Sequence, residues 1–474
     1  MRRIFYLATA ITVLVTLLPA ELQARIVTGK VTCGDKNLSK VIVTDGTNFT
    51  KTKGNGTFKM DIADTARFVY IITPSGYSAD WSSGAPEFYQ KAEGKDYFAF
   101  DLIKTGDDYS KYNIIAVADP QPSRQRHCDE YRGDPIQDVY QTIRKIDGPT
   151  VAIVLGDVCF NVYEFMGTWK ETVKNASIPF YAIPGNHDHI YEIENDKASV
   201  AEYNKYFGPE FYAFFMGKDI VIMLDNIIQG MHKGKHNYSE GYTDEIINWV
   251  AGLMKFVPKY ANIYVGQHSP LSGRNKDLSF IYNGNKLVNL LKDHRLNFIS
   301  GHNHCNYNYS YNDGMVTEHV IAAICGTWWD AYHCADGTPR GYKVYTNTGD
   351  FLSWYYKSIG KDKSFQYEIF RPGECQVNPT KWVVNVWDYD SEWRVEWMED
   401  TKHMGTMKKV KEYNPLHTAE INATFEKKGK PVTSWKRTVK GKHYFAASPS
   451  PEAKTITIII KSRFGETWTE TFNL

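Results

Sequence analysis

Hydrophobic and polar residues alternate with a period of two over the first part of the chain, from about residue 25 to residue 102. The runs are short and are separated by turn dipeptides, as where Val41-Ile42-Val43 precedes Asp45-Gly46. Such runs with Asp-Gly and Asn-Gly turns are typical of β-hairpins. The pattern predicts a small β-sandwich domain over residues 25–105.

The pattern changes between about residues 112 and 357, where continuous apolar runs alternate with amphipathic stretches. The apolar runs that indicate buried strands are Ile114–Ala118, Val151–Leu155, Phe180–Ile183, Ile220–Leu224, Ile263–Val265 and Phe298–Ile299. The stretches with helical spacing include Pro135–Lys145, Asp244–Lys255 and Leu287–Lys292. Buried strands that alternate with helices indicate an α/β domain, which we place at residues 106–365.

Strand-like runs return after residue 372 and predict a second small β-sandwich domain at residues 370–474. These runs are Trp382–Val386, Arg394–Met398, Thr433–Arg437, Thr455–Ile460 and Thr467–Phe472. The predicted fold class is therefore an α/β core flanked by two small all-β sandwich domains.

Residues 1–24 have the pattern of a cleaved signal peptide. Met1-Arg2-Arg3 forms a short basic region, the uncharged stretch Ile4–Ala20 follows it, and Ala24 offers a cleavage site. An N-terminal membrane anchor is the alternative, which Pro19 and the threonines of the stretch disfavour. We therefore expect an exported protein, periplasmic or extracellular, with no transmembrane segment once the signal is removed.

Charge and cysteine content narrow the function classes. The 474 residues include 55 basic and 54 acidic side chains, which gives a formal net charge of +1. General nucleic-acid binding is not expected, because it requires a net basic field. The seven cysteines include no CxxC pair, and their odd number leaves at least one thiol without an intrachain partner.

Polar side chains with metal-binding chemistry directly follow five of the predicted strands. They are Asp119-Pro120-Gln121, Gly156-Asp157, Gly185-Asn186-His187-Asp188, Gly266-Gln267-His268 and Gly301-His302-Asn303-His304. The carboxyl ends of strands in an α/β sheet meet at one edge, where such folds build their sites. Most of these motifs alone are typical of ordinary turns or strand ends, and the two histidines of Gly301–His304 alone fit a metal site and a structural role equally well, but all five in this order indicate a metal site.

Carboxylate oxygens and neutral imidazoles are the ligands that a pair of borderline divalent cations prefers. Two such cations, about 3.5–4 Å apart, hold both the attacking and the leaving oxygen of an in-line displacement at phosphorus. They also lower the pKa of a bridging water, so that hydroxide is available as the nucleophile near neutral pH.

This ordered set of motifs resembles that of the calcineurin-like metallophosphoesterase family, and the similar region spans about residues 112–357. The resemblance implies a four-layer αββα core of two mixed sheets packed between helices, with β domains like those of exported bacterial members. It implies two divalent metal ions, Mn, Zn or Fe, as cofactors. The implied ligands are Asp119, Gln121 and His304 at the first metal, Asp157 as the bridge, and Asn186, His268 and His302 at the second.

The resemblance also implies that His187 contacts the substrate phosphate and protonates the leaving-group oxygen as a general acid. Two positions depart from the family pattern. Gln121 stands where many members have His, and Phe160 stands where many have the Asp that orients the catalytic histidine. Asp188 and Asn161 are the alternatives for that orienting role, and we group Asp188 with His187 as a catalytic candidate.

Six further residues are candidates for substrate contacts: Arg124, His127, Trp328, Trp329, Asp330 and Arg340. The first two could bind phosphate through charge and bidentate donors, or belong to a solvated loop. The two tryptophans could stack on a base or sugar, or be packed in the interior.

The leading hypothesis is a dimetal-dependent phosphoesterase that hydrolyses a phosphodiester or a pyrophosphate-containing substrate, either a small molecule or a lipid. One alternative is a phosphomonoesterase of the same fold. Another is a non-catalytic exported binding protein with a structural metal site, which His187 argues against because such a site has no use for a histidine that is not a ligand. We expect a monomer.

Overall fold

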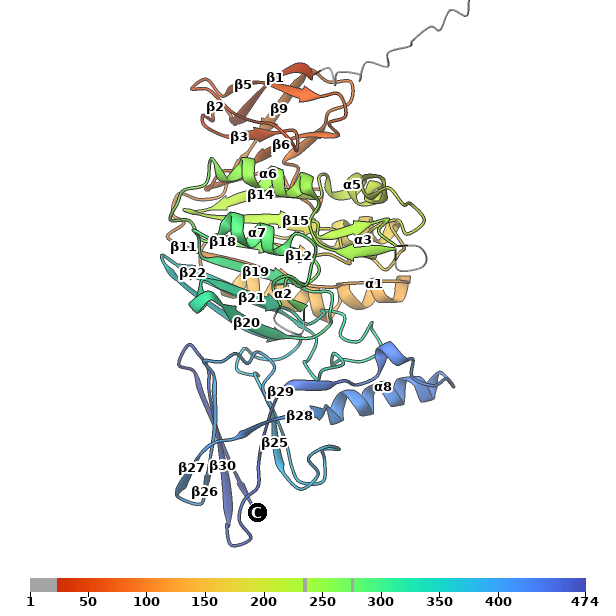
Figure 1. Cartoon of the computed structure of the whole chain (residues 1–474), viewed down its shortest axis with the longest axis vertical. Helices are drawn as coiled ribbons and strands as arrows, with labels where there is room; N and C mark the ends of the chain where they lie inside the picture. The colour runs from red at the N-terminus through yellow and green to blue at the C-terminus, as the bar shows by residue number, and fades with distance from the viewer. Residues whose placement is uncertain (1–23, 233–236, 274–276) are drawn as a thin grey trace, which may run out of the picture.

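Three regions follow one another along the long axis of the molecule, from the N-terminal β domain through the α/β core to the C-terminal domain (Figure 1). The computed structural model describes residues 24–232, 237–273 and 277–474. The predicted signal peptide therefore lies outside the described residues, except for its last residue. Within those ranges no helix is both long enough and apolar enough to cross a membrane.

The N-terminal domain contains two four-stranded sheets and a two-stranded ribbon. The first sheet consists of β1 (Ala24–Cys33), β2 (Lys36–Asn37), β5 (Thr57–Ala63) and β9 (Tyr97–Asp101), and the second of β3 (Ile42–Thr44), β4 (Phe49–Lys51), β6 (Phe68–Ile72) and β8 (Tyr89–Lys91); β7 (Tyr77–Ser78) pairs with β10 (Ile103–Lys104). Burial alternates along β5, where Phe58, Met60 and Ile62 are buried. The period-two pattern of the sequence thus appears as one buried and one more exposed face.

The N-terminal domain packs tightly on the core. A parallel bridge joins Thr73 to Phe214. The rings of Phe49 and Tyr70 lie 6.0 and 6.4 Å from the ring of Trp249, which is 1% exposed. Residues of both regions belong to one continuous hydrophobic cluster. The two domains therefore share a core rather than meeting across a solvated linker.

The α/β core contains a five-stranded and a six-stranded sheet. The five-stranded sheet has the order β13 (Phe180–Ile183), β12 (Thr150–Leu155), β11 (Lys111–Val117), β22 (Gly341–Thr348), β23 (Phe351–Ser358). The six-stranded sheet has the order β14 (Phe211–Met216), β15 (Asp219–Leu224), β18 (Ile263–Gly266), β19 (Leu296–Ser300), β21 (Val316–Val320), β20 (Tyr307–Tyr311), and β16 (Ile227–Gln229) pairs with β17 (Tyr238–Glu240) beside it.

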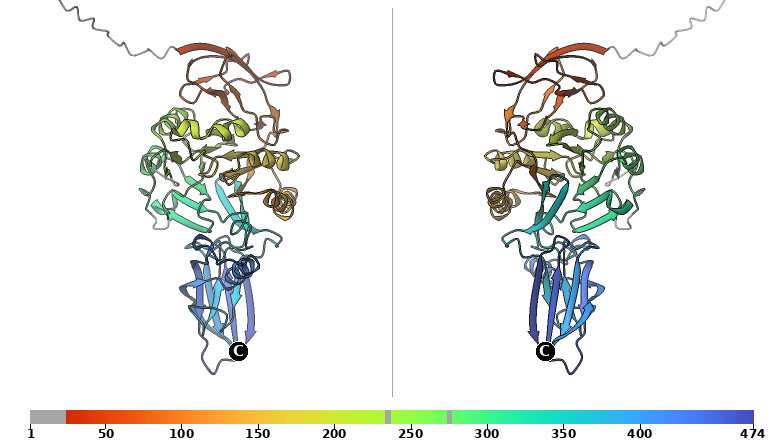
Figure 2. Two further views of the ribbon diagram at one scale, coloured as in Figure 1. Left: turned by 90° about the vertical axis from the view of Figure 1, so that its right-hand side faces the viewer. Right: turned by 90° about the vertical axis from the view of Figure 1, so that its left-hand side faces the viewer.

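Helices cover the outer faces of the two sheets, and Figure 2 shows the sheets between them. The helices are α1 (Gln125–Arg132), α2 (Asp134–Lys145), α3 (Glu164–Val173), α4 (Asp196–Ser199), α5 (Ala201–Phe207), α6 (Asp244–Met254) and α7 (Gly284–Leu291), and a short 3-10 turn η2 (Asn312–Gly314) precedes β21. Between the sheets, the Tyr112 hydroxyl on β11 donates to Asp219 Oδ2 on β15 at 2.6 Å. This arrangement confirms the predicted α/β fold class with β-rich flanking regions.

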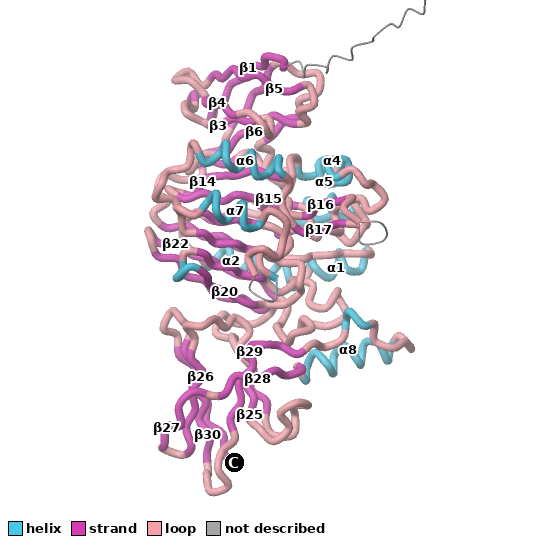
Figure 3. Tube along the Cα trace, in the orientation of Figure 1, coloured by secondary structure: helices cyan, strands magenta, loops and turns pink. Residues whose placement is uncertain are grey.

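The C-terminal domain contains two four-stranded sheets and one helix, which stands out in Figure 3. The sheets consist of β24 (Glu368–Phe370), β25 (Trp382–Asn385), β28 (Lys408–Tyr413), β29 (Lys440–Ala447), and of β26 (Arg394–Glu399), β27 (Lys402–Thr406), β30 (Thr455–Lys461), β31 (Thr467–Asn473). The helix α8 (Pro415–Lys427) begins after Asn414, whose side chain accepts from the His417 backbone N–H.

One predicted strand of the C-terminal domain is wrong. Residues 433–437 form the 3-10 turn η3 (Ser434–Lys436) instead. This segment reaches toward the α/β core, where Lys436 forms an ion pair with Asp330. A tertiary contact thus overrides the local strand propensity.

Candidate active site

The loops that follow five parallel strands hold the residues singled out in the sequence. Strands β11, β12 and β13 run parallel in one sheet, and β18 and β19 run parallel in the other. The loops bring Asp119, Asp157 and His268 so close that one ligand atom of each lies within 4.8 Å of the other two. Both sheets therefore contribute to one polar cluster at their carboxyl ends.

The side chains of this cluster lie within reach of common ligands. His268 Nε2 is 3.4 Å from Asp157 Oδ1 and 3.0 Å from Asn186 Oδ1. His304 Nε2 is 3.7 Å from Asp119 Oδ1. All five residues are buried, with relative exposures of 4% or less. Polar atoms this close in a buried place require either mutual hydrogen bonds or a bound cation.

The backbone of the loops is strained where the ligands sit. The φ angles of the motif residues are left-handed at Asp119 (52°), Gln121 (43°), Asp157 (50°), His302 (66°) and His304 (47°). This conformation costs a residue with a side chain about 1–2 kcal/mol, although Asp and His tolerate it better than most. Such strain concentrated in one place is typical of functional sites.

Two motif glycines are required by close approach. A Cβ atom on Gly185 would lie 2.3 Å from Asp157 Oδ1, and a Cβ atom on Gly301 would lie 2.4 Å from Asp119 Oδ2. Any side chain at either position would therefore displace a carboxylate of the cluster. The glycines of the motifs let the loops come together.

Hydrogen bonds to the backbone orient the buried histidines. His268 Nδ1 donates to the Leu155 carbonyl at 2.8 Å, and His304 Nδ1 donates to the Gly326 carbonyl at 3.2 Å. Nε2 of each ring therefore carries the lone pair and faces the cluster. Burial lowers the pKa of His268 well below its ordinary value and that of His304 to about 3. Both imidazoles are thus held in the neutral form that binds metals.

The residues of the cluster fit bound divalent cations. His304 Nε2 and Gln121 Oε1 are buried and have no hydrogen-bond partner among the described residues. Burial raises the pKa of both Asp119 and Asp157, and the charge of Asp119 raises that of Asp157 further. Open acceptor atoms and uncompensated negative charge are what a bound cation would satisfy. The Gln121 amide also donates through Nε2 to Asp157, which leaves its oxygen for the metal.

Two residues that support the cluster were missed in the sequence. Glu240, at the end of β17, lies with Oε1 3.7 Å from His302 Nε2, while Nδ1 of that ring is 3.1 Å from His268 Nε2. Asn226 Oδ1 accepts from the backbone N–H of His268. Asn226 follows β15 just as the ligands follow their strands, so its position offered a signal. Glu240 lies in a hairpin far along the chain and offered none.

His187 lies beside the cluster, and the side chains of Asn161, Tyr191 and Phe160 contact its ring. Asn161 Oδ1 is 3.0 Å from Nδ1, and the Tyr191 hydroxyl is 3.1 Å from the same nitrogen. The Phe160 ring stacks on the imidazole with centroids 4.0 Å apart. An amide oxygen can only accept, so the hydrogen bond to Asn161 places a proton on Nδ1. Of the two alternatives for an orienting residue, Asn161 contacts the ring.

The Asp188 carboxylate is directed elsewhere. It accepts from the backbone N–H groups of Val158 (3.0 Å), Cys159 (2.9 Å) and Gly185 (2.9 Å). The side chain is fully buried, and burial raises its pKa to about 6. These bonds tie the loop after β12 to the loop after β13, which carry Asp157 and Asn186.

The six candidate substrate contacts differ in how exposed they are and in which partners they already have. Arg124 is exposed at the start of α1. His127 and Trp329 are buried against each other, and Trp329 Nε1 donates to the Pro120 carbonyl at 2.9 Å. The Arg340 guanidinium lies 6.0 Å from the ring of Trp329. The two remaining candidates, Trp328 and Asp330, lie where the C-terminal domain meets the core.

Trp328 and Asp330 both have partners already. The Trp328 ring stacks on the His304 ring with centroids 4.2 Å apart. Asp330 forms ion pairs of 2.6 Å with Lys428 and with Lys436 of the C-terminal domain. Asp330 thus joins the core to the C-terminal domain, and its predicted contact with substrate stays a prediction.

Three models of protein families match this chain and together cover most of its length. Residues 112–306 match a calcineurin-like phosphoesterase model. Residues 25–105 match a model of the N terminal of calcineurin-like phosphoesterase, and residues 318–468 match one of the C terminal. The C-terminal match begins within the α/β core, at β21.

Similar proteins include a curated relative and several solved structures. A probable glycerophosphodiester phosphodiesterase from Arcobacter nitrofigilis is 33% identical over 128 residues, which are 26% of this chain and 43% of that protein. The chain thus spans less than half the length of this curated relative. Solved structures of 5'-nucleotidases from Candida albicans (10% identity, 52% of each chain, TM-score 0.34) and Thermus thermophilus (11% identity, 52% and 54%, TM-score 0.30) are also similar.

Proposed function

Because the chain belongs to the calcineurin-like phosphoesterase family, we propose that it is a metal-dependent hydrolase of phosphate esters whose preferred substrates are phosphodiesters. The observation that carries this proposal is the buried cluster of Asp119, Asp157 and His268, with ligand atoms within 4.8 Å of one another and His187 beside it. The relative named as a phosphodiesterase favours diesters. A phosphomonoesterase would use the same cluster, and the test below separates the two.

The metal ligands would be those that the family resemblance implies: Asp119, Gln121, Asp157, Asn186, His268, His302 and His304. When bound, two divalent cations supply Lewis-acid stabilisation of the phosphate charge and lower the pKa of water. A neutral amide is a weaker ligand than an imidazole, so Gln121 is expected to favour a harder cation such as Mn²⁺ over Zn²⁺.

His187 would transfer a proton from Nε2 to the oxygen of the leaving group. Asn161 and Tyr191 hold Nδ1, and the stacked Phe160 limits ring rotation, so the ring is oriented before substrate binds. Asn161 would thus replace the orienting carboxylate that many family members have. Asp188 would act through the backbone that carries Asp157 and Asn186, as a positioning residue.

We further propose that residues 1–24 are a signal peptide, which directs export of the protein and is then cleaved. Residues 25–105, 106–365 and 370–474 would form its three domains. The basic start and apolar stretch of the N-terminus support export.

The test is hydrolysis of bis-p-nitrophenyl phosphate and p-nitrophenyl phosphate by protein loaded with Mn²⁺, Zn²⁺ or Fe²⁺. Faster turnover of the diester is the expected result, and chelation of the metals should abolish it. Faster turnover of the monoester would replace the diesterase proposal with the phosphomonoesterase. If neither compound nor a panel of nucleotides and phospholipids is hydrolysed, the protein is a binding protein with a structural metal site.

A further inference from the structure

A series of three aromatic rings leads from the metal cluster to the surface. The ring of Trp328 stacks on the His304 ring at a centroid distance of 4.2 Å. The ring of Trp435 meets Trp328 edge to face, with centroids 4.8 Å apart. The side chain of Trp435 is 53% exposed, whereas His304 is buried and Trp328 is half-buried. The exposed indole of Trp435 is thus connected to the proposed metal ligand His304 through the ring of Trp328.

Trp435 comes from the C-terminal domain, and ion pairs fix its position. The next residue, Lys436, lies with Nζ 2.6 Å from Asp330 Oδ2 and 4.8 Å from the Trp435 ring centroid. Lys428, just after α8, pairs with the other carboxylate oxygen of Asp330, also at 2.6 Å. The side chain of Lys436 is only 12% exposed. The indole is therefore held in place before any ligand arrives, which reduces the entropy lost on binding.

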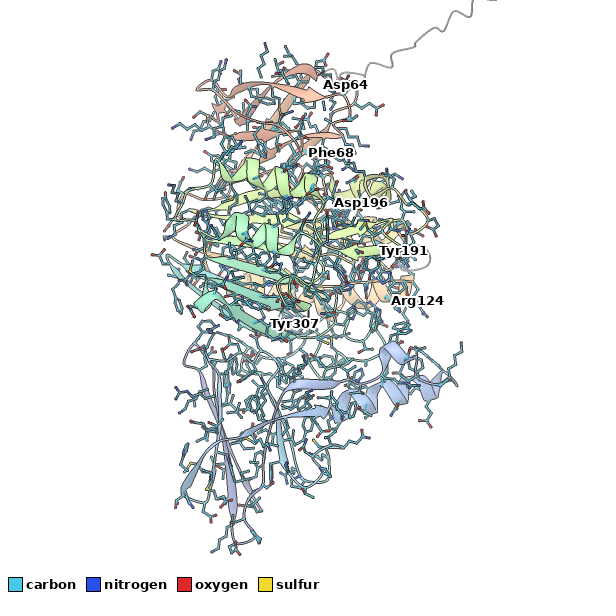
Figure 4. The ribbon with its side chains drawn as sticks, viewed as in Figure 1. Asp64, Phe68, Arg124, Tyr191, Asp196 and Tyr307 are labelled. Atoms are coloured by element: carbon cyan, nitrogen blue, oxygen red, sulfur yellow. The ribbon has the colours of Figure 1, made fainter. Side chains whose placement is uncertain are left out.

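Three basic side chains, Arg124, Arg126 and Lys436, lie near His127. Arg124 lies on the side of the core that also carries Tyr191, and nearer than Tyr191 to the C-terminal domain (Figure 4). Burial lowers the pKa of His127 to about 4, and the cations Arg124, Arg126 and Lys436 lower it too. Asp330 acts in the opposite direction on this pKa, and Arg126 and Lys436 are ion-paired with Glu130 and Asp330, so the exposed Arg124 is the cation most open to an anionic ligand. An exposed indole beside such charge suits a ligand that has both a ring and a phosphate.

We propose that Trp435 is a specificity-determining residue, and that its indole stacks on an aromatic ring carried by the phosphate ester. The substrate class is then aryl or nucleotide-like esters rather than aliphatic ones. This inference rests on the proposed hydrolase function and adds the C-terminal domain to the substrate site. The geometry that carries it is the ring contact from His304 through Trp328 to Trp435, together with the exposure of Trp435.

The binding test uses phenylphosphonate and methylphosphonate, which are not hydrolysed, with the Mn²⁺-loaded full chain in calorimetric titrations. Wild-type protein should bind phenylphosphonate about 5- to 140-fold more tightly than methylphosphonate, the range that base–aromatic stacking gives. Trp435→Ala should reduce this ratio to about one, and Trp435→Phe should keep most of it. Tyr260→Ala, which removes a ring that is 72% exposed elsewhere, is the matched control and should leave the ratio unchanged.

A turnover test separates this inference from the proposed function. Trp435→Ala should raise KM for bis-p-nitrophenyl phosphate but not for an aliphatic ester such as glycerol 3-phosphocholine, with kcat little changed. If wild type hydrolyses both esters and Trp435→Ala affects them equally or not at all, the inference is wrong and the function stands. If wild type hydrolyses neither ester, the function is wrong, and the phosphonate ratio still decides whether Trp435 binds rings. If Trp435→Ala has the same ratio of phenylphosphonate to methylphosphonate affinity as wild type, the inference is wrong. This would also be the result if Trp435 contacts another protein rather than the substrate.

Discussion

Several aspartates of this molecule are buried against histidines, and two of these pairs differ in their hydrogen bonding: one lies in the metal cluster and the other lies between the core and the C-terminal domain. In the first, Asp119 Oδ1 lies 3.7 Å from His304 Nε2, a nitrogen without a hydrogen-bond partner within the described ranges. In the second, Asp336 Oδ2 lies 3.2 Å from His443 Nε2, and the other ring nitrogen of His443 is bonded to Asn385. The residue types are the same, but both ring nitrogens of His443 have hydrogen-bond partners, and we call this second pair closed.

The pKa values of the two aspartates move in opposite directions. Burial raises the pKa of Asp119. Burial also acts to raise the pKa of Asp336, but the hydrogen bond and charge of His443 and backbone donors from Thr338 and Asn306 lower it overall. Asp119 accepts from the His302 backbone N–H, but the neutral His304 donates nothing to it, so its charge is left for a bound cation to compensate. For these two pairs, the direction of the pKa shift distinguishes the aspartate of the ligand site from the aspartate of the structural contact, although the residue types are the same.

The largest effect is expected at His187, which should matter for turnover and not for metal binding. His187→Asn should lower kcat about 10²- to 10⁴-fold, the range for loss of a general acid. Metal content measured by mass spectrometry should stay the same. His443→Asn, in the closed pair, is the control and should keep the kcat of wild type. Loss of bound metal in His187→Asn would mean that this residue is a ligand.

Replacing each aspartate by asparagine should have opposite effects on metal-free protein. Asp336→Asn breaks a closed pair and should lower the free energy of unfolding by about 3–5 kcal/mol. Asp119→Asn should leave it unchanged or raise it, because a group with a raised folded pKa is destabilising when ionised at neutral pH. Chemical denaturation at pH 7 with chelator present measures both. Equal destabilisation by the two substitutions would contradict the comparison.

A further histidine, His333, makes the free energy of unfolding depend on pH through its ion pairs with Glu368 and Glu420. Burial opposes the charged form of His333, yet Glu368 and Glu420 raise its pKa to about 9. Since this value lies above the unfolded value of about 6.5, the stabilisation is complete below pH 6.5 and is lost as pH rises through 9. The loss should be on the order of 3 kcal/mol. Denaturation at pH 6 and pH 10 should show it in wild type, and His333→Gln should lack the pH-dependent part.

The smallest of these effects concerns the support of a ligand. Glu240→Gln removes the charge beside His302 and should weaken metal binding about 10- to 100-fold, as loss of an outer partner of a ligand does. Competition with a fluorescent chelator measures the affinity. Glu396→Gln, a glutamate with a histidine contact in the C-terminal domain, is the matched control and should bind metal as wild type does. An unchanged affinity in Glu240→Gln would remove this residue from the site.

The sequence predicted the α/β core and the loops that form the cluster, because each motif directly follows a buried strand and the strand ends must meet. It did not predict Glu240 or Tyr191, whose approach depends on how a hairpin and a loop fold back over the cluster. The sequence also did not show the role of Asp330, because its partners Lys428 and Lys436 are about 100 residues away. These lysines lie at the end of α8 and in η3, and the strand-like pattern of that region predicted neither element. Local patterns show what a strand end presents, but not what the tertiary fold brings against it.

The shared core of the N-terminal domain and the α/β core has a consequence for folding. Because Phe49 and Tyr70 pack against the almost completely buried Trp249, neither region has a complete interior alone. The two should melt in one cooperative calorimetric transition, and a chain that begins after residue 105 should expose an aromatic surface and aggregate. The N-terminal domain is in this sense a part of the enzyme's folding unit rather than a detachable module.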